Sequence, residues 1–412
     1  ELGKIRHWQF HQSRLALSDY NKARQLRLRA IALAPRDVEN RKKLSNTLPN
    51  IAETYSALAD REGLLRVWQD QQENDLRILE LDPYDPQSFY SVSAHTEDLA
   101  DTLTNIGRKE EGAAQLKVSF DLIEKAIALQ QAAPVSLDGQ VWLVSFSMQK
   151  AGLLHKWGRS DEALAVYQAA SDLAVQTYRA DNTKRFAFNH ASRIHRYMGD
   201  IYAERGDWQK YLECSEFSMN WIRENRDNRN LWAGGFPPLE AFYIVRVGIA
   251  LNKLGQKQAG IARVDEGLNL HYQAVRLHPN HGEDVFYAFE LIEPATQFYL
   301  DTNQINKAVA IWENYIEMTE PFVAKNPDDT SSRGFLSYAF ERKGDILAGY
   351  EKERETFAQT DISKLRQAQT SYQEGLRHRQ QILQLDPMNQ AHIEAENFLT
   401  LKISRLDARL KG

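Results

Sequence analysis

The chain has 412 residues, of which 42% are hydrophobic and 26% charged, a composition typical of a folded, soluble protein. Its formal net charge of −5 argues against non-specific binding to nucleic acid, which normally needs a basic excess, so we expect no nucleic-acid partner. The single cysteine, Cys214, excludes an intramolecular disulfide and a thiolate metal cage.

The longest apolar runs, such as residues 141–146, are far shorter than the roughly 18 residues that a membrane-spanning helix needs. We therefore expect no membrane insertion and a cytoplasmic location, and a periplasmic one is also compatible with the sequence. Because the sequence begins at Glu1 with neither a methionine nor a signal-like segment, we expect a processed or excised piece of a longer protein.

Prolines mark regular intervals along the chain, each after an apolar, helix-forming run. Successive intervals are about 48 residues or a multiple of this length, except for a last interval of about 60 residues. Since proline does not continue a helix, each one predicts a turn between helices. The prolines of this series are Pro35, Pro83, Pro134, Pro279, Pro327 and Pro387.

A second series of breaks lies near the middle of these intervals. It begins near Ala59 and continues with Gly107, Gly158, Gly206, Gly255 and Asn303. The two series together predict a repeated unit of about 48 residues that contains two helices of about 20 residues each.

The residues around these turns show a recurring pattern of small and aromatic side chains. Residues 198–206 contain Met198, Gly199 and Tyr202 before the turn at Gly206, and a second helix contains Ala163, Tyr167 and Ala170. Ala308 and Trp312 repeat the second pattern. This sequence resembles the tetratricopeptide (TPR) repeat family, which implies an all-α, right-handed superhelical solenoid of helical hairpins.

Glycine within a helix lowers its stability, so we expect Gly199 to be there for close helix packing. We also expect Asp207 to cap the helix that follows Gly206. The TPR unit has about 34 residues, and the excess here adds about seven residues, or two turns, to each helix without rotating its buried face. Such lengthened repeats resemble arrays C-terminal to other domains in bacterial signalling proteins, including Ser/Thr kinases.

We expect residues 1–412 to form a single solenoid of about eight hairpins with two interruptions. Residues 223–238 are polar and rich in Gly and Pro, which predicts a long loop in place of the first turns of a helix. The charged insertion at 349–362 explains the long last interval and predicts a solvated helix or loop. Residues 388–411 predict a single amphipathic helix that caps the array.

The sequence lacks the motifs that identify common catalytic and nucleotide-binding sites. His278 and His281 lie near two acidic residues, but polar residues of a turn explain them better than a metal site. For Cys214 a buried structural thiol is a better explanation than a nucleophile, because no partner base is evident. We therefore expect no enzyme, no metal and no cofactor.

One predicted first helix carries a basic stripe. Arg185, Asn189, Arg193 and Arg196 lie along one face, which predicts a binding site for the carboxylates or phosphates of an acidic partner. The alternative is a solvated face paired with neighbouring acids such as Asp200 and Glu204. Acidic clusters on other first helices favour a partner of mixed charge; they are Glu97, Asp98 and Asp101, and Glu290 and Glu293.

The loop at 223–238 is a second candidate surface. Trp232 and Phe236 are flanked by Gly and Pro residues and would provide an aromatic anchor for a partner. The alternative is that they fold back over apolar surface that the shortened helix leaves uncovered.

These features favour a module that binds a protein or peptide, as the non-catalytic part of a larger bacterial signalling or regulatory protein. Two alternatives stay open. One is a structural scaffold or oligomerisation segment, and the other is a sensory domain that controls a linked kinase or transcription regulator. The sequence does not define the oligomeric state.

Overall fold

In the computed structural model the prediction of an all-α fold is confirmed. The described part of the chain is built of helices, apart from the two-residue strands β1 (Tyr350–Glu351) and β2 (Thr356–Phe357). None of the helices searched there is long and apolar enough to cross a membrane. The structure describes residues 13–57, 60–228, 239–277, 282–325, 327, 330–352, 354–385, 387 and 390–411.

Contacts between residues divide the chain into two compact units. Unit 1 comprises residues 1–22, 53–64 and 257–412, and unit 2 comprises residues 23–52 and 65–256. Three N-terminal helices contribute residues to both units: α2 (Ser13–Leu33), α4 (Leu48–Ala57) and α5 (Arg61–Leu81). The single solenoid expected for residues 1–412 stays a prediction.

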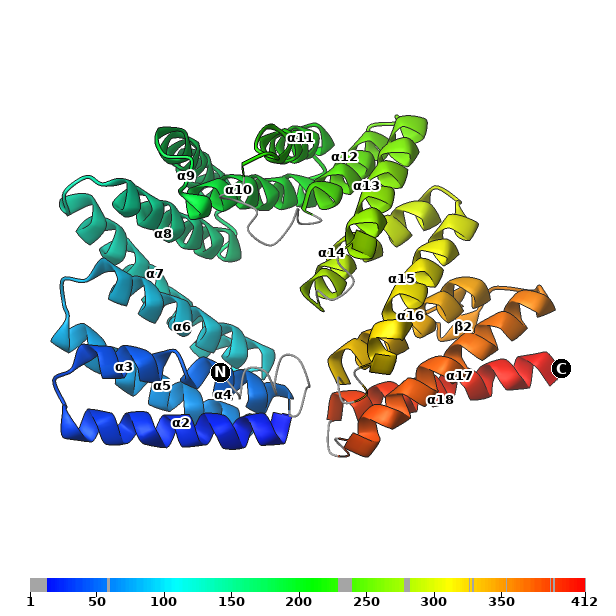
Figure 1. Cartoon of the computed structure of the whole chain (residues 1–412), viewed down its shortest axis with the longest axis horizontal. Helices are drawn as coiled ribbons and strands as arrows, with labels where there is room; N and C mark the ends of the chain where they lie inside the picture. The colour runs from blue at the N-terminus through cyan, green and yellow to red at the C-terminus, as the bar shows by residue number, and fades with distance from the viewer. Residues whose placement is uncertain are drawn as a thin grey trace. The chain divides into compact units, whose positions relative to one another are not determined.

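Unit 2 contains a series of antiparallel helix pairs that follow one another along a curved row (Figure 1). Helices α6 and α7, α8 and α9, and α10 and α11 form hairpins, and each hairpin packs against the next. The helices are α3 (Val38–Ser45), α6 (Pro86–Asn105), α7 (Lys109–Ala132), α8 (Leu137–Lys156), α9 (Ser160–Ala180), α10 (Arg185–Glu204), α11 (Trp208–Glu224) and α12 (Leu239–Lys253).

Unit 1 continues the same pattern of consecutive packed helices. Each of its helices contacts the next one along the chain. They are α13 (Lys257–Leu277), α14 (Gly282–Asp301), α15 (Ile305–Lys325), α16 (Thr330–Ala348), α17 (Ile362–Leu385) and α18 (Gln390–Lys411). Many helices of both units have 20 to 24 residues, in agreement with the predicted length.

The predicted turns within hairpins are confirmed by their backbone geometry. Gly206 has a φ of +72°, its N–H donates to the Ala203 carbonyl at 3.0 Å, and the next N–H, of Asp207, donates to Tyr202 at 2.9 Å. This pair of bonds is the Schellman motif, which satisfies carbonyls at the end of a helix. The same bonds and a positive φ recur at Gly107, Gly158, Gly255 and Asn303.

The turns between hairpins agree with the proline series wherever the structure describes them. Pro83 lies between α5 and α6, and Asp85 then caps α6 by accepting from the N–H groups of Gln87 and Ser88 at 3.1 Å. Asp207 caps α11 in the same way, through the N–H of Lys210, as expected. Pro279 lies outside the described residues.

The first predicted helix after Pro35 is not continuous. It is divided into α3 and α4 at Asn46–Thr47, where a single helix of about 20 residues was expected. Pro49 explains the break, because its ring would clash with the carbonyl of Ser45 in a continuous helix and it has no N–H to donate.

The insertion at 349–362 is exposed over most of its described residues, as its charge predicts, but it also contains a short β-hairpin. Its strands β1 and β2 form an antiparallel hairpin in which Tyr350 pairs with Phe357. Phe357 is buried in a core cluster with Tyr372, and Leu399 and Leu406 of α18 belong to the same cluster. Phe357 and the partly buried Tyr350 therefore pack the insertion against α17 and α18 of unit 1.

The close packing expected at Gly199 is present. A Cβ at this position would lie 3.5 Å from the Cβ of Cys214 in α11 and 3.1 Å from Nη2 of Arg246 in α12. Cys214 is buried, and burial raises the pKa of its thiol to about 12, which favours the structural role over that of a nucleophile.

Candidate functional site

The basic stripe lies along one face of α10, the first helix of its hairpin. Its members are spaced by four, four and three residues, which places them above one another on a helix. Arg185 and Arg193 are exposed, whereas Asn189 and Arg196 are partly buried. His190 is buried instead, with its Nε2 2.9 Å from Oγ of Ser145 in α8.

Aromatic rings lie beside the arginines of this stripe. Nη2 of Arg193 donates to the hydroxyl of Tyr197 at 3.1 Å, and the guanidinium carbon of Arg196 lies 5.1 Å from the ring centre of Phe242 in α12. A solvated helix face would pair the stripe with the neighbouring acids Asp200 and Glu204. Both acids instead have partners on other helices. Asp200 pairs with Arg246 at 2.8 Å, and Glu204 lies 3.4 Å from Nε2 of His155.

The rings continue onto the preceding first helices. Tyr90 of α6 and Trp142 of α8 have ring centres 6.2 Å apart and are both partly exposed. Burial raises the pKa of the Tyr90 hydroxyl, and the charge of Arg193 opposes this rise, so Arg193 of α10 acts electrostatically on α6. We use the term first-helix face for the surface formed by Tyr90, Trp142, Arg185, Asn189, Arg193, Arg196, Tyr197 and Phe242.

Three of the acidic residues singled out on the first helices, Glu97, Asp101 and Glu293, pair with basic residues of neighbouring first helices. Lys156 of α8 lies 2.7 Å from both Glu97 and Asp101 of α6. In unit 1, Glu293 accepts from Arg342 at 3.0 Å and from Tyr338. By contrast, neither Arg185 nor Arg193 forms an ion pair within the described ranges. The first-helix face therefore presents positive charge beside aromatic surface.

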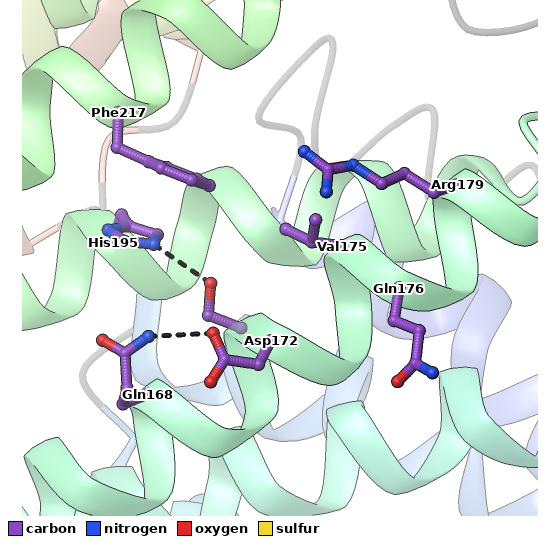
Figure 2. Close-up of a pocket in the computed structure, with 8 residues that line it drawn as sticks. Gln168, Asp172, Val175, Gln176, Arg179, His195 and Phe217 are labelled. Carbon is purple, nitrogen blue, oxygen red and sulfur yellow. Dashed lines mark hydrogen bonds between the residues drawn. The ribbon is translucent and has the colours of Figure 1, made fainter.

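A pocket of 470 Å³ in unit 2 is lined by residues of α9, α10 and α11 (Figure 2). The imidazole of His195 stacks on Phe217, with ring centres 3.6 Å apart, and Nε2 of His195 lies 3.0 Å from Oγ of Ser171. Figure 2 shows Arg179 at the opposite end. The lining residues are Gln168, Ser171, Asp172, Val175, Gln176, Arg179, His195 and Phe217.

The Ser171–His195 pair was not singled out from the sequence, because its members lie 24 residues apart on different helices. Its geometry does not favour hydrolysis. Burial lowers the pKa of His195 to about 4, Nδ1 has no hydrogen-bond partner in the described structure, and Ser171 is only 1% exposed. A hydrolytic triad needs an accessible hydroxyl and a carboxylate on Nδ1. The pair therefore serves packing in the floor of the pocket.

Several predicted features lie outside the described residues. Trp232 and Phe236 are among residues 229–238, and His278 and His281 lie in a second such segment. The loop predicted from residue 223 begins later, because α11 continues to Glu224. The carboxylate of Glu240, which is 1% exposed, pairs with Arg223 and Arg226 and so ties the end of α11 to the start of α12.

The fold and its repeated turns define a protein of helical-hairpin repeats. Neither the family models nor the curated proteins contain a match to the sequence. Solved structures of similar fold include BtubC from P. vanneervenii, with 15% identity, coverage of 64% of this chain and 92% of that chain, and a TM-score of 0.47.

Two further solved structures have a similar fold. The C-terminal part of a TPR repeat-containing protein from Cytophaga hutchinsonii has 14% identity, covers 83% of this chain and 97% of that chain, and has a TM-score of 0.38. The match to yeast Tom70 has 14% identity, covers 83% of this chain and 63% of that chain, and has a TM-score of 0.37.

Proposed function

We propose that this chain is a TPR-like interaction module whose first-helix face binds a protein segment with acidic and apolar side chains. The observation that carries the proposal is the juxtaposition of Arg185 and Arg193, which lack ion pairs among the described residues, with rings from four successive first helices. Arginine and large aromatic residues contribute most of the energy at protein interfaces.

The chemistry of this face indicates the class of partner. A guanidinium binds a carboxylate through two parallel hydrogen bonds, and partly exposed rings bury apolar side chains on contact. The charge on the face is local, because Glu97 and Asp101 of α6 are already paired with Lys156. We propose a role without catalysis or a cofactor, as the interaction part of a larger bacterial signalling or regulatory protein.

The test uses the full chain and a fluorescent peptide of alternating glutamate and leucine, with the glutamine–leucine peptide as a neutral control. We expect the acidic peptide to bind more tightly, because only it pairs with the arginines. Arg193→Glu should weaken its binding by about tenfold, as expected for the loss of one charge-assisted contact. Fluorescence anisotropy measures both affinities.

The control variant is Lys117→Glu, which makes the same charge change on an exposed residue of α7, a second helix. It should leave the affinity for the acidic peptide unchanged. Equal losses for both variants would show that net charge alone drives binding, and no loss for Arg193→Glu would refute the proposed face.

A further inference from the structure

Unit 1 contains a pocket of 380 Å³ to which the basic stripe does not contribute. Residues of α16, α17 and α18 enclose the pocket together with one residue of α14. The shape of the pocket therefore depends on how α16, α17 and α18 pack. It is lined by Phe289, Thr330, Gly334, Phe335, Tyr338, Arg379 and His392.

The guanidinium of Arg379 is the distinctive group in this pocket. The side chain is 7% exposed, and its Nη1 lies 2.5 Å from Nδ1 of His392. Its Nε is buried with no hydrogen-bond partner in the described structure, and no carboxylate pairs with it there. An arginine stays charged when buried, and a buried charge without a counter-charge is costly.

The groups around Arg379 do not supply that counter-charge. Glu341 is the acid whose charge acts on Arg379, but Nζ of Lys402 already binds it at 2.8 Å. Arg333 and Arg377 contact the ring of His378, the residue before Arg379, at 3.5 and 3.2 Å. Among the described residues, no carboxylate forms an ion pair with Arg379, because Glu341 is bound by Lys402 and Glu374 by Arg377.

The remainder of the pocket wall is aromatic. The ring centre of Phe289 lies 4.8 Å from that of Phe335 and 5.5 Å from that of Tyr338. The hydroxyl of Tyr338 donates to Glu293 at 2.6 Å, so its polar end already has a partner and its ring is left for apolar contact.

Gly334 keeps the space between the rings and the guanidinium open. A Cβ at this position would lie 3.6 Å from Cε1 of His392 and 3.9 Å from Nη1 of Arg379, which are ordinary contacts. A methyl group therefore fits, whereas a longer side chain would extend into the pocket or displace these two groups.

We propose that this pocket binds a carboxylate attached to an aromatic group, with the carboxylate on Arg379 and the ring against Phe289 and Phe335. The negative charge would compensate the buried guanidinium, and the aromatic wall would exclude water from the pair. The site lies in unit 1, so it stands or falls independently of the proposed role of the first-helix face.

The test is isothermal titration calorimetry of the full chain with 3-phenylpropionate and with its neutral analogue 3-phenylpropionamide. We expect the carboxylate to bind about tenfold more tightly than the amide, because only the carboxylate pairs with Arg379. Gly334→Leu should abolish binding by filling the pocket, and Gly334→Ala should retain it. Equal affinities for the acid and the amide, or undiminished binding to Gly334→Leu, would overturn the proposal.

The variant Arg379→Met tests whether Arg379 binds a ligand or only stabilises the fold. If the guanidinium lacks a counter-charge, this variant should unfold at the same temperature as the parent chain or a higher one, and should lose the thermal shift that 3-phenylpropionate gives. A lower unfolding temperature without ligand would show that Arg379 stabilises the fold, and would contradict the proposal.

Discussion

At the scale of single residues, Lys402 shows how unit 1 holds its C-terminal helix. Its side chain is 2% exposed, and Nζ lies 2.8 Å from Glu341 and 2.7 Å from Asp345. The rings of Tyr350 and Phe398 face the same ammonium group, at 4.3 and 4.5 Å. The charge is therefore fully paired and links α18 to α16 and to the β-hairpin.

Lys402→Met should destabilise the protein strongly, because it removes the buried cation that pairs with the partly buried carboxylates of Glu341 and Asp345 while it keeps most of the side-chain volume. We expect a loss of about 3–5 kcal/mol in the free energy of unfolding, the usual cost of breaking a buried pair. Arg405→Met is the control. It removes an ion pair with Glu355 that is partly exposed, and it should cost less than about 1 kcal/mol. Urea unfolding compares the variants, and equal losses would refute this account.

His271 contrasts with Lys402, because it is a buried polar residue without hydrogen-bond partners in the described structure. It is 0% exposed, and neither ring nitrogen has a hydrogen-bond partner in the described structure. His271→Leu should therefore raise the free energy of unfolding by about 1 kcal/mol, since an unsatisfied buried group is removed. His95→Leu should lower it, because Nδ1 of His95 lies 3.0 Å from the buried carboxylate of Asp75. Urea unfolding measures both variants. A lower unfolding midpoint for both would contradict the predicted opposite effects of the two substitutions.

At the scale of elements, the turns within hairpins could be predicted because each depends on one residue. Gly107, Gly158, Gly206 and Gly255 all have a positive φ, and asparagine, the usual substitute for glycine there, occupies the equivalent position 303 with a φ of +61°. The β-hairpin at 349–362 could not be predicted in this way. Its fold depends on the burial of Phe357 against the flanking helices and against Leu399 and Leu406, which lie more than 40 residues further along the chain.

Gly206→Ala and Gly206→Asn test the role of the turn. No atom lies within 4 Å of a Cβ at this position, so any loss is conformational. We expect alanine to cost about 1 kcal/mol, and asparagine less, because it adopts left-handed conformations more readily. Thermal unfolding measures both. An alanine variant as stable as the parent would show that the left-handed turn does not limit the stability of the hairpin.

At the scale of the whole molecule, the first-helix face could be predicted only in part. The spacing of Arg185, Asn189, Arg193 and Arg196 already placed them on one side of a helix. The rings of Tyr90, Trp142 and Phe242 join them only through the packing of neighbouring hairpins, which leaves no local sequence signal. The sequence also suggested Asp200 as a partner for the arginines of the stripe. In the structure its partner is Arg246, 46 residues away.

The buried histidines predict a stability that depends on pH. Burial lowers the pKa to about 4 for four of them, whereas an unfolded histidine titrates near about 6.5. Between these values the unfolded chain binds more protons, so the histidines' contribution to stability is complete above pH 6.5 and is lost as the pH falls towards 4. Asp98 and Asp345, whose pKa values burial raises, act in the opposite direction but are fewer. The histidines are His190, His195, His271 and His378.

We therefore expect the unfolding temperature to fall steadily between pH 7 and pH 5. His271→Leu should reduce the slope, because it removes one of the groups that take up a proton on unfolding. Calorimetric melting at several pH values measures both effects. A constant unfolding temperature over this range would mean that these histidines titrate alike in the folded and unfolded chains.

Binding through the first helices of the repeated hairpins can be tested by photo-cross-linking. The most direct measurement places a photo-reactive p-benzoylphenylalanine at Phe242 on the first-helix face, or at Val118 on the exposed side of α7, and irradiates each full chain with the glutamate–leucine peptide. We expect cross-linking from position 242, lost on Arg193→Glu, and none from position 118. Cross-linking from position 118 alone, or equal cross-linking from both, would contradict this prediction.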